Sequence, residues 1–469
     1  MYRALLQTIA LITLIAGRAP AEAGPLLDPS WGTGGVRTLA TLGGYVEGIG
    51  SCPHANGSIS LIGYRATTAT LVIVRLTASG QFDTAFSGDG VAELPIGQAF
   101  DISRSAVSCS GVGNSVPEDD RAMVVGVAPG AYDLTVAALL DLHAGSFDSQ
   151  FYLGGPGLYD LGGVLFPPQN QVRPYPITRV QGVFPGPAGG WLVAGQFDGH
   201  ASGVPAGFIA RLTAGGAVDA ITQPIVAGFT SRNLSTARVG ADGDIRVLGD
   251  GTYEGGYTWG LLRLDPASLQ PIALSDHGVA DIFPLAFYKG RQIGGGLMVA
   301  AALQFDASPF GASPWLMVVR GDEVSEVALP AAPMADGVPL GPSGLPGSAA
   351  ATGAAGNRAV FAMGLRSLDQ AIAGYYVAMV QLGDGAGTPD VVDTRFARDG
   401  AGSFRYRVSP TSCAPTATPP QRFANLSSWG DRTLLVGSVA PDCAPTGDGW
   451  MLSARLLTDG ETLHRDGFE

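Results

Sequence analysis

Five aspartates recur along this chain, and in four copies an aromatic residue follows three positions later. The first copy reads Leu27-Asp-Pro-Ser-Trp-Gly-Thr-Gly-Gly35. Carboxylates in Gly-rich turns could bind calcium, but the sequence shows no twelve-residue loop with a closing Glu. An Asp side chain can instead accept backbone N–H groups in the turn that follows it. We therefore predict a structural role, at the crossing between repeats, for Asp28, Asp83, Asp148, Asp219 and Asp393 and for the aromatic residues Trp31, Phe86, Phe151 and Phe396.

The other residues that could carry chemistry are isolated. The five histidines have no second His at ligand spacing, and a lone His is usually a turn or surface residue. The nucleophile-elbow pattern Gly-x-Ser-x-Gly and a phosphate-binding glycine loop with a lysine are both absent. Asp242-Gly243 is better explained as a hairpin turn in which Gly adopts a positive φ. The sequence thus predicts no catalytic, metal-ligating or cofactor-binding residue.

Two series of short apolar segments must position these turns. One series ends at the anchor residues Arg75, Leu140, Arg211, Arg263, Arg320, Gln381 and Arg455. The other precedes each anchor and covers residues 60–63, 123–126, 192–195, 246–249, 298–301, 360–364 and 435–437. Both series have seven members, which is the internal evidence for seven repeats.

The segments are typical of β-strands because they are short, rich in Val, Ile, Leu and aromatic residues, and bounded by Gly, Asp, Ser or Pro. Each unit of about 60 residues supplies roughly four strands, which is the arrangement of a propeller blade. We predict an all-β, seven-bladed β-propeller. An array of β-sandwiches with Gly-rich turns is the alternative.

Here the chain resembles the delta-60 repeat family, whose bacterial β-propeller-like repeats read loosely Arg-Leu-x-x-x-Gly-x-Leu-Asp-x-x-Phe-Gly-x-x-Gly. Residues 75–90 are the clearest match and residues 27–36 the second, whereas the units ending at Arg263, Arg320 and Gln381 have lost the Asp and the aromatic residue. The resemblance implies a propeller fold and export. It implies no activity and no catalytic residues.

The N-terminus predicts export. A short positive start precedes an apolar run from Ala4 to Gly17, and a small-x-small site ends at Ala23, as in a secretory signal peptide. We divide the chain into a signal peptide (1–23), one propeller domain (24–460) and a C-terminal tail (461–469) that resembles a sorting tag. The mature protein is expected to be secreted, periplasmic or at the cell surface.

Four cysteines in an exported chain suggest disulfides. Cys413 and Cys443 are expected in two loops at the same end of the last blade. Cys52 and Cys109 occupy equivalent positions in the first two units, which neighbouring blades would bring close. Buried free thiols are the alternative.

Charge and composition restrict the partners. The formal net charge is −13, and the 27 Lys and Arg residues form no basic block, so nucleic acid and membrane insertion are not expected. We predict no cofactor and a non-enzymatic binding or scaffold module for an unknown protein or glycan. The alternative is a secreted glycan-active hydrolase or lyase with carboxylates in the propeller channel.

Overall fold

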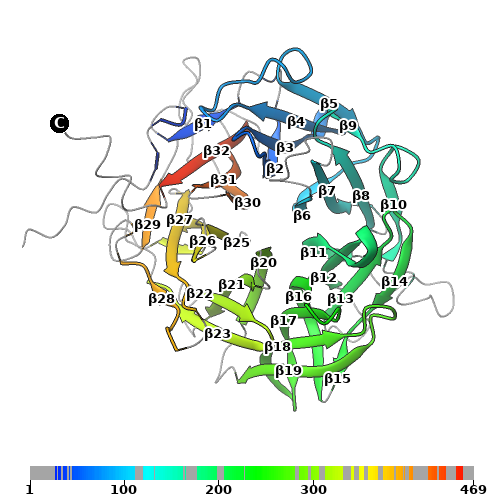
Figure 1. The fold of residues 1–469 in the computed structure, drawn as a ribbon, viewed down its shortest axis with the longest axis vertical. Coiled ribbons are helices and arrows are strands. Elements are labelled where there is room, and N and C mark those ends of the chain that lie inside the picture. The colour runs from blue at the N-terminus through cyan, green and yellow to red at the C-terminus, as the bar shows by residue number, and fades with distance from the viewer. Residues whose placement is uncertain are drawn as a thin grey trace, which may run out of the picture.

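The chain folds as a ring of seven antiparallel blades in a computed structural model (Figure 1). The structure describes residues 27–457 except 29, 33–34, 40–41, 43–44, 111–119, 131–132, 162–163, 165–176, 198–204, 227, 280–284, 294–296, 306–311, 331–339, 343–347, 353–356, 368–372, 385–386, 395, 397–400, 405–420, 430–431 and 440–449. Among the residues described, no helix is long and apolar enough to cross a membrane.

Each blade is a meander that runs from a strand near the ring axis to strands at the rim (Figure 1). Blade 1 contains β2 (Glu47–Pro53), β3 (Ile59–Arg65), β4 (Thr70–Leu76) and β5 (Val91–Pro95), with the 3₁₀ helix η1 (Ala66–Thr68) between β3 and β4. Blade 2 contains β6 (Asp101–Ser110), β7 (Arg121–Ala128), β8 (Leu134–Asp141), β9 (Ser146–Phe147) and β10 (Gly157–Tyr159). Blade 3 contains β11 (Ile177–Pro185), the 3₁₀ helix η4 (Pro187–Gly189), β12 (Trp191–Phe197), β13 (Ala206–Leu212) and β14 (Val218–Thr222).

The remaining blades follow the same order. Blade 4 contains β15 (Ile225–Val226), β16 (Phe229–Val239), β17 (Ile245–Tyr253), β18 (Gly256–Leu264) and β19 (Pro271–Val279). Blade 5 contains β20 (Leu285–Ile293), β21 (Leu297–Phe305), β22 (Ala312–Arg320) and β23 (Glu323–Ala328). Blade 6 contains β24 (Leu340–Pro342), β25 (Ser348–Thr352), β26 (Arg358–Ser367), β27 (Ala373–Gln381), β28 (Val391–Val392) and β29 (Ala401–Phe404).

Blade 7 closes the ring with strands from both parts of the chain. Its inner strands are β30 (Gln421–Trp429), β31 (Arg432–Val439) and β32 (Trp450–Leu457), and its outermost strand is β1 (Val36–Thr38). β1 pairs antiparallel with β32, with Val36 opposite Ala454. Backbone hydrogen bonds therefore join the first strand to the last.

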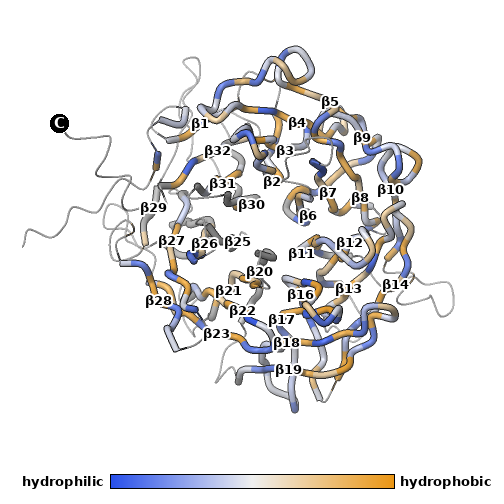
Figure 2. Tube along the Cα trace, in the orientation of Figure 1, coloured by the Kyte–Doolittle hydropathy of each residue, from blue (hydrophilic) through white to orange (hydrophobic). Residues whose placement is uncertain are grey.

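The core is divided among the interfaces between blades. Among the described residues, the buried apolar side chains form seven clusters, and each cluster joins two adjacent blades. β3 shows the cause, because all seven of its residues are buried. Hydrophobic residues recur through the strands in Figure 2. Strands covered on both faces carry continuous apolar runs rather than alternating ones.

The seven-bladed propeller is therefore confirmed. The strand series that precedes the anchors corresponds to β3, β7, β12, β17, β21, β26 and β31. Residues 157–159 pair antiparallel with β8 as an outer strand of blade 2. The signal peptide, Ala23 and the C-terminal tail lie outside the described residues.

Candidate functional site

Four of the recurring aspartates, Asp28, Asp83, Asp148 and Asp393, lie in the turns between blades, whereas Asp219 lies within β14. The carboxylates of Asp28, Asp83 and Asp148 each accept a backbone N–H two residues further on, at 2.9, 3.2 and 2.8 Å. Asp28 is also bonded to Arg455, whose Nη2 lies 2.5 Å from its carboxylate. Burial alone would raise the pKa of Asp28, but hydrogen bonds from Ser30 and the charge of Arg455 outweigh it and lower that pKa.

The aromatic residues of the repeat pack against a glycine of the next blade. Trp31 lies against Gly80, Phe86 against Gly145 and Phe151 against Gly216. All three glycines have positive φ, and an added Cβ would lie within about 3 Å of the ring. This close approach, together with the positive φ, explains why Gly recurs there.

Several anchor arginines complete these contacts across the blade boundary. Arg455 donates to the carbonyl of Ala78 at 2.9 Å and lies over the Trp31 ring. Arg211 forms an ion pair with Asp219 at 2.5 Å, and its Nη2 donates to the carbonyl of Ala267 at 2.8 Å. An anchor arginine thus ties the end of one blade to the turn of the next.

Where the anchor is not an arginine, a neighbouring strand supplies one. Gln381 occupies the anchor position of blade 6, and Arg358 lies directly opposite it on β26. Arg358 pairs with Asp393 at 3.5 Å. In blade 2, whose anchor is Leu140, Arg121 of β7 pairs with Asp148 at 2.5 Å. The ion pair is retained although the sequence position of its arginine changes.

The disulfide prediction is confirmed for one pair. Cys52 of β2 and Cys109 of β6 are bonded, with an S–S distance of 2.08 Å. The bond joins the inner strands of blades 1 and 2. Cys413 and Cys443 lie outside the described residues.

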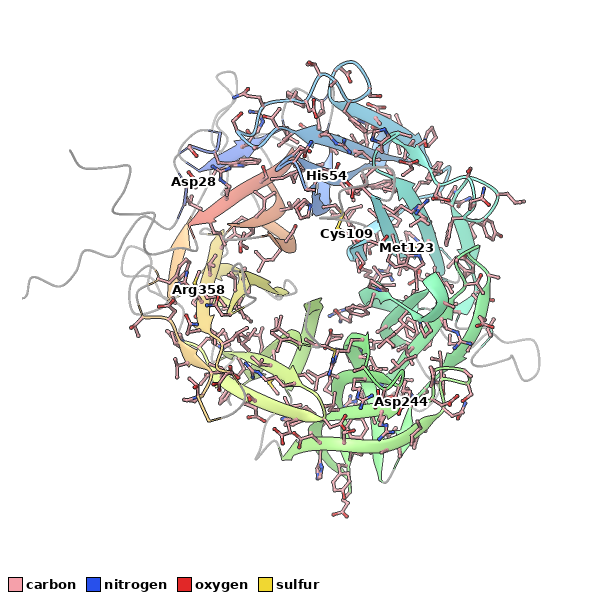
Figure 3. The ribbon with its side chains drawn as sticks, in the orientation of Figure 1. Asp28, His54, Cys109, Met123, Asp244 and Arg358 are labelled. Atoms are coloured by element: carbon pink, nitrogen blue, oxygen red, sulfur yellow. A yellow bond between two sulfur atoms is a disulfide. The ribbon has the colours of Figure 1, made fainter. Side chains whose placement is uncertain are left out.

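His54 begins the turn between β2 and β3, as expected of a lone histidine, but its side chain is buried beside this disulfide (Figure 3). Its Nδ1 contacts Oδ2 of Asp120, and its Nε2 lies 2.8 Å from Oγ of Ser60. Asp120 belongs to blade 2, whereas His54 and Ser60 belong to blade 1.

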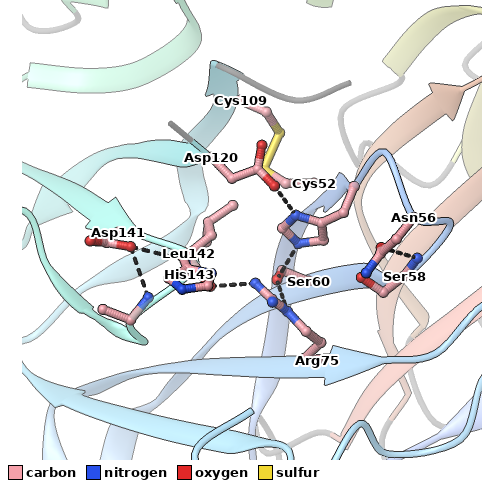
Figure 4. Close-up of polar contacts among 12 residues, drawn as sticks. Cys52, Asn56, Ser58, Ser60, Arg75, Cys109, Asp120, Asp141, Leu142 and His143 are labelled. Carbon is pink, nitrogen blue, oxygen red and sulfur yellow. Dashed lines mark hydrogen bonds and ion pairs between the residues drawn. A yellow bond between two sulfur atoms is a disulfide. The ribbon is translucent and has the colours of Figure 1, made fainter. Parts of the chain in front are cut away.

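The hydrogen bonds continue into a closed circuit between the two blades (Figure 4). Arg75 donates its Nε–H to Ser60 at 3.4 Å and a second N–H to the carbonyl of Leu142. The N–H of Leu142 donates to the carbonyl of Asp120 at 3.0 Å, which returns the circuit to its start.

The order Ser60–His54–Asp120 is that of a hydrolytic triad, but its nucleophile is inaccessible. Ser60 has 0% of its surface exposed, and a substrate carbonyl cannot reach its Oγ. Burial lowers the pKa of His54, the bond to Asp120 opposes that shift, and the Arg75 charge adds to it. A buried neutral imidazole between a hydroxyl and a carboxylate fits a structural contact between blades.

The described inner strands offer few groups for acid–base catalysis. Their buried polar side chains are neutral apart from Arg238: Ser51, Ser105, Gln181, Ser231, Asn233, Ser235, Thr236 and Ser427. Glu47 and Asp101 begin the adjacent inner strands β2 and β6, and Asp101 is paired with Arg104 at 2.7 Å. In the part of the chain that the structure describes, no three His, Cys, Asp or Glu residues are grouped as a metal site.

Sequence reasoning missed Ser60, Asp120, Arg121 and Arg358. The signal for Arg358 was available, because it follows a turn and precedes the apolar segment that pairs with Gln381. Asp120 gave no signal, since it is separated from His54 by 66 positions and does not belong to the repeated pattern.

Three solved structures illustrate the known proteins that are similar. A protein of unknown function from Dyadobacter fermentans is 14% identical, with 91% of this chain and 100% of that chain covered and a TM-score of 0.40. An exo-β-1,3-galactanase of Bifidobacterium bifidum, itself named without proof of activity, is 12% identical, with 61% and 89% covered and a TM-score of 0.34. A GH43 endo-arabinanase from Bacillus licheniformis is 11% identical, with 61% and 96% covered and a TM-score of 0.33.

These likenesses are too distant to carry an argument about activity, and no curated protein matches the chain. The family comparison is local. Residues 189–220 match a family described as "Domain of unknown function (DUF5122) beta-propeller". This stretch runs from the end of η4 into β14 and includes Arg211 and Asp219. Blade 3 is therefore similar to a bacterial β-propeller repeat, and the delta-60 resemblance stays a prediction.

Proposed function

We propose that the protein is an exported, non-enzymatic β-propeller that serves as a binding scaffold for another protein. The observation that carries this proposal is the segment around β10, at the outer part of blade 2, where four large apolar side chains are exposed. The exposed fractions are 45% for Tyr152, 102% for Leu153, 38% for Leu158 and 58% for Val164. Large apolar side chains gathered on a surface mark sites of interaction.

Blade 3 holds this segment in place. Tyr152 donates its N–H to the carbonyl of Gly215 at 3.1 Å, and the hydroxyl of Tyr159 donates to the carbonyl of Gly216. The rings of Tyr152 and Tyr159 lie 5.8 Å apart. Leu153 is fixed with its side chain in solvent at a φ of 61°, a conformation that favours glycine. Aliphatic groups on an ordered surface suit a protein partner better than the hydroxyl groups of a glycan.

Export is supported by the predicted signal peptide and by the Cys52–Cys109 bond. Disulfides persist mainly in oxidising compartments. If the chain is exported, mass spectrometry of the protein recovered outside the cytoplasm should find Gly24 as its first residue. Recovery of the intact N-terminus would contradict export through this signal peptide.

A photo-crosslinking residue at position 153 tests the binding surface. In cells that produce the protein, the variant with the crosslinking residue in place of Leu153 should form a covalent adduct with a partner protein. Mass spectrometry identifies that partner. The matched control carries the same crosslinking residue in place of Ile225, a residue of blade 4 that is 56% exposed. No adduct at 153, or equal adducts at both positions, would overturn the proposal.

A glycan hydrolase is the second candidate. The observation that favours it is that Glu47 and Asp101 begin adjacent inner strands, at the same end of the ring. Glycosidases use two carboxyl groups at a defined separation. If this candidate holds, the protein should release reducing ends from a polysaccharide, and both Glu47→Gln and Asp101→Asn should abolish that release. Release that survives both substitutions would exclude this carboxylate pair.

A further inference from the structure

We propose that His54 closes blade 1 onto blade 2 only while its ring is neutral, so that mild acid opens this interface and exposes the Cys52–Cys109 disulfide to reduction.

The hydrogen bonds around the ring suit a neutral imidazole. Arg75 can only donate, so Ser60 accepts its N–H and keeps its own hydroxyl hydrogen to give. Nε2 of a neutral ring can accept that hydrogen while Nδ1 donates to Asp120. Protonation of Nε2 would bring a second cationic donor, beside Arg75, onto the same buried hydroxyl.

The charges around the ring come from both blades. Asp120 is bonded to it and favours the proton, and Asp83 acts in the same direction from the turn after β4. Arg75 on β4 opposes the proton, and Asp141 of blade 2 acts on Arg75. Burial is the largest influence, and together these groups lower the pKa of His54. An opened interface returns the ring to water and to its ordinary pKa, so acid favours the open form.

The disulfide reports this opening. Cys52 lies two residues before His54 and is fully buried, and Cys109 is partly buried on the facing strand. A water-soluble phosphine acts in acid as well as at neutral pH. It gives the sulfur atoms two electrons, the S–S bond breaks, and water supplies the oxygen of the phosphine oxide and the hydrogens of two thiols. The reaction needs access to a sulfur atom, which the closed interface restricts because Cys52 is fully buried and Cys109 partly so.

The experiment measures phosphine reduction of Cys52–Cys109 between pH 7.5 and 5.5, a range that spans the ordinary pKa of histidine. After quenching, the free thiols are alkylated, and peptide mass spectrometry measures how much of Cys52 and Cys109 is alkylated. Each reduction rate of the protein is divided by the reduction rate of a small-molecule disulfide at the same pH. The wild-type rate should rise in acid, by up to about tenfold for each unit below pH 6.5. A flat wild-type profile would overturn the proposal.

Three variants separate the sensor from its surroundings. His54→Gln should be reduced faster at neutral pH and should show no acid rise, and a retained rise would overturn the proposal. His143→Gln, which removes an exposed histidine of blade 2, should keep the wild-type rise. Asp120→Asn keeps the His54 ring but removes the anion bonded to it. Its acid rise should be at least as large as in the wild type, and loss of the rise would show that His54 is not the sensor.

Discussion

Blade 7 meets blade 1 through side chains of the repeat, whereas blade 1 meets blade 2 through the repeat and an additional cluster. At the first interface, Trp31 packs on Gly80, and Arg455 bridges Asp28 and the carbonyl of Ala78. At the second, Phe86 packs on Gly145, but Arg75 also enters a circuit through His54 beside a disulfide. The repeat supplies the common geometry, and residues outside the repeat add a response to pH and to reductants.

The largest effect is expected from the side chain that holds blade 7 to blade 1. Trp31→Ala removes a fully buried indole that fills the space against Gly80 and below Arg455. We expect a loss of about 3–5 kcal/mol in the free energy of unfolding, measured by denaturant titration. Tyr257→Ala, at a 47% exposed position, is the control and should lose less than about 1 kcal/mol. Equal losses would show that the repeat contact does not dominate the interface.

The covalent bond between blades 1 and 2 should come next. The disulfide closes a loop with a sequence separation of 57, so the Cys52→Ala/Cys109→Ala variant should lose about 2–4 kcal/mol by the same measurement. Cys109→Ala alone should lose a similar amount, because the bond is absent in both. A loss below about 1 kcal/mol would mean that the noncovalent contacts suffice here.

A smaller effect tests whether the position of the arginine matters. Arg358→Gln leaves Asp393 buried without this ion pair and should lower the unfolding free energy by about 1.5–3 kcal/mol. Adding Gln381→Arg places an arginine at the usual anchor, directly opposite, and should recover part of the loss. No recovery in the double variant would show that the two positions are not equivalent.

The smallest effect is the pH dependence contributed by Asp28. Because its pKa is lowered in the folded protein, its contribution is complete above the ordinary value of 3.8 and is lost as the pH falls through the folded value. Asp28→Asn should flatten the fall in the free energy of unfolding below pH 4, by less than about 1 kcal/mol, measured by denaturant titration at each pH. Asp89→Asn, in an exposed turn, is the control and should leave that fall unchanged.

The repeat could be predicted from the sequence because its parts are local. Asp83, Phe86 and Gly90 lie within one turn, and their spacing alone indicates a recurring unit. The partner of Trp31, of Phe86 and of Phe151 is in each case a glycine of the next unit, which the repeat also contains. His54 and Asp120 have no such copies, and only the packing of two blades brings them together. Burial of His54 could therefore not be inferred from its neighbours in sequence.

The pairing of β1 with β32 sets the order in which the molecule can fold. Val36 must wait for Ala454, so a growing chain can stack its early blades but has no partner for β1 until the last strand emerges. Contacts between such distant residues cost loop-closure entropy and form slowly. Until that moment the chain is an open arc, with the facing surfaces of blades 1 and 7 exposed to other chains. Ring closure is therefore the final step of folding and the stage most vulnerable to aggregation.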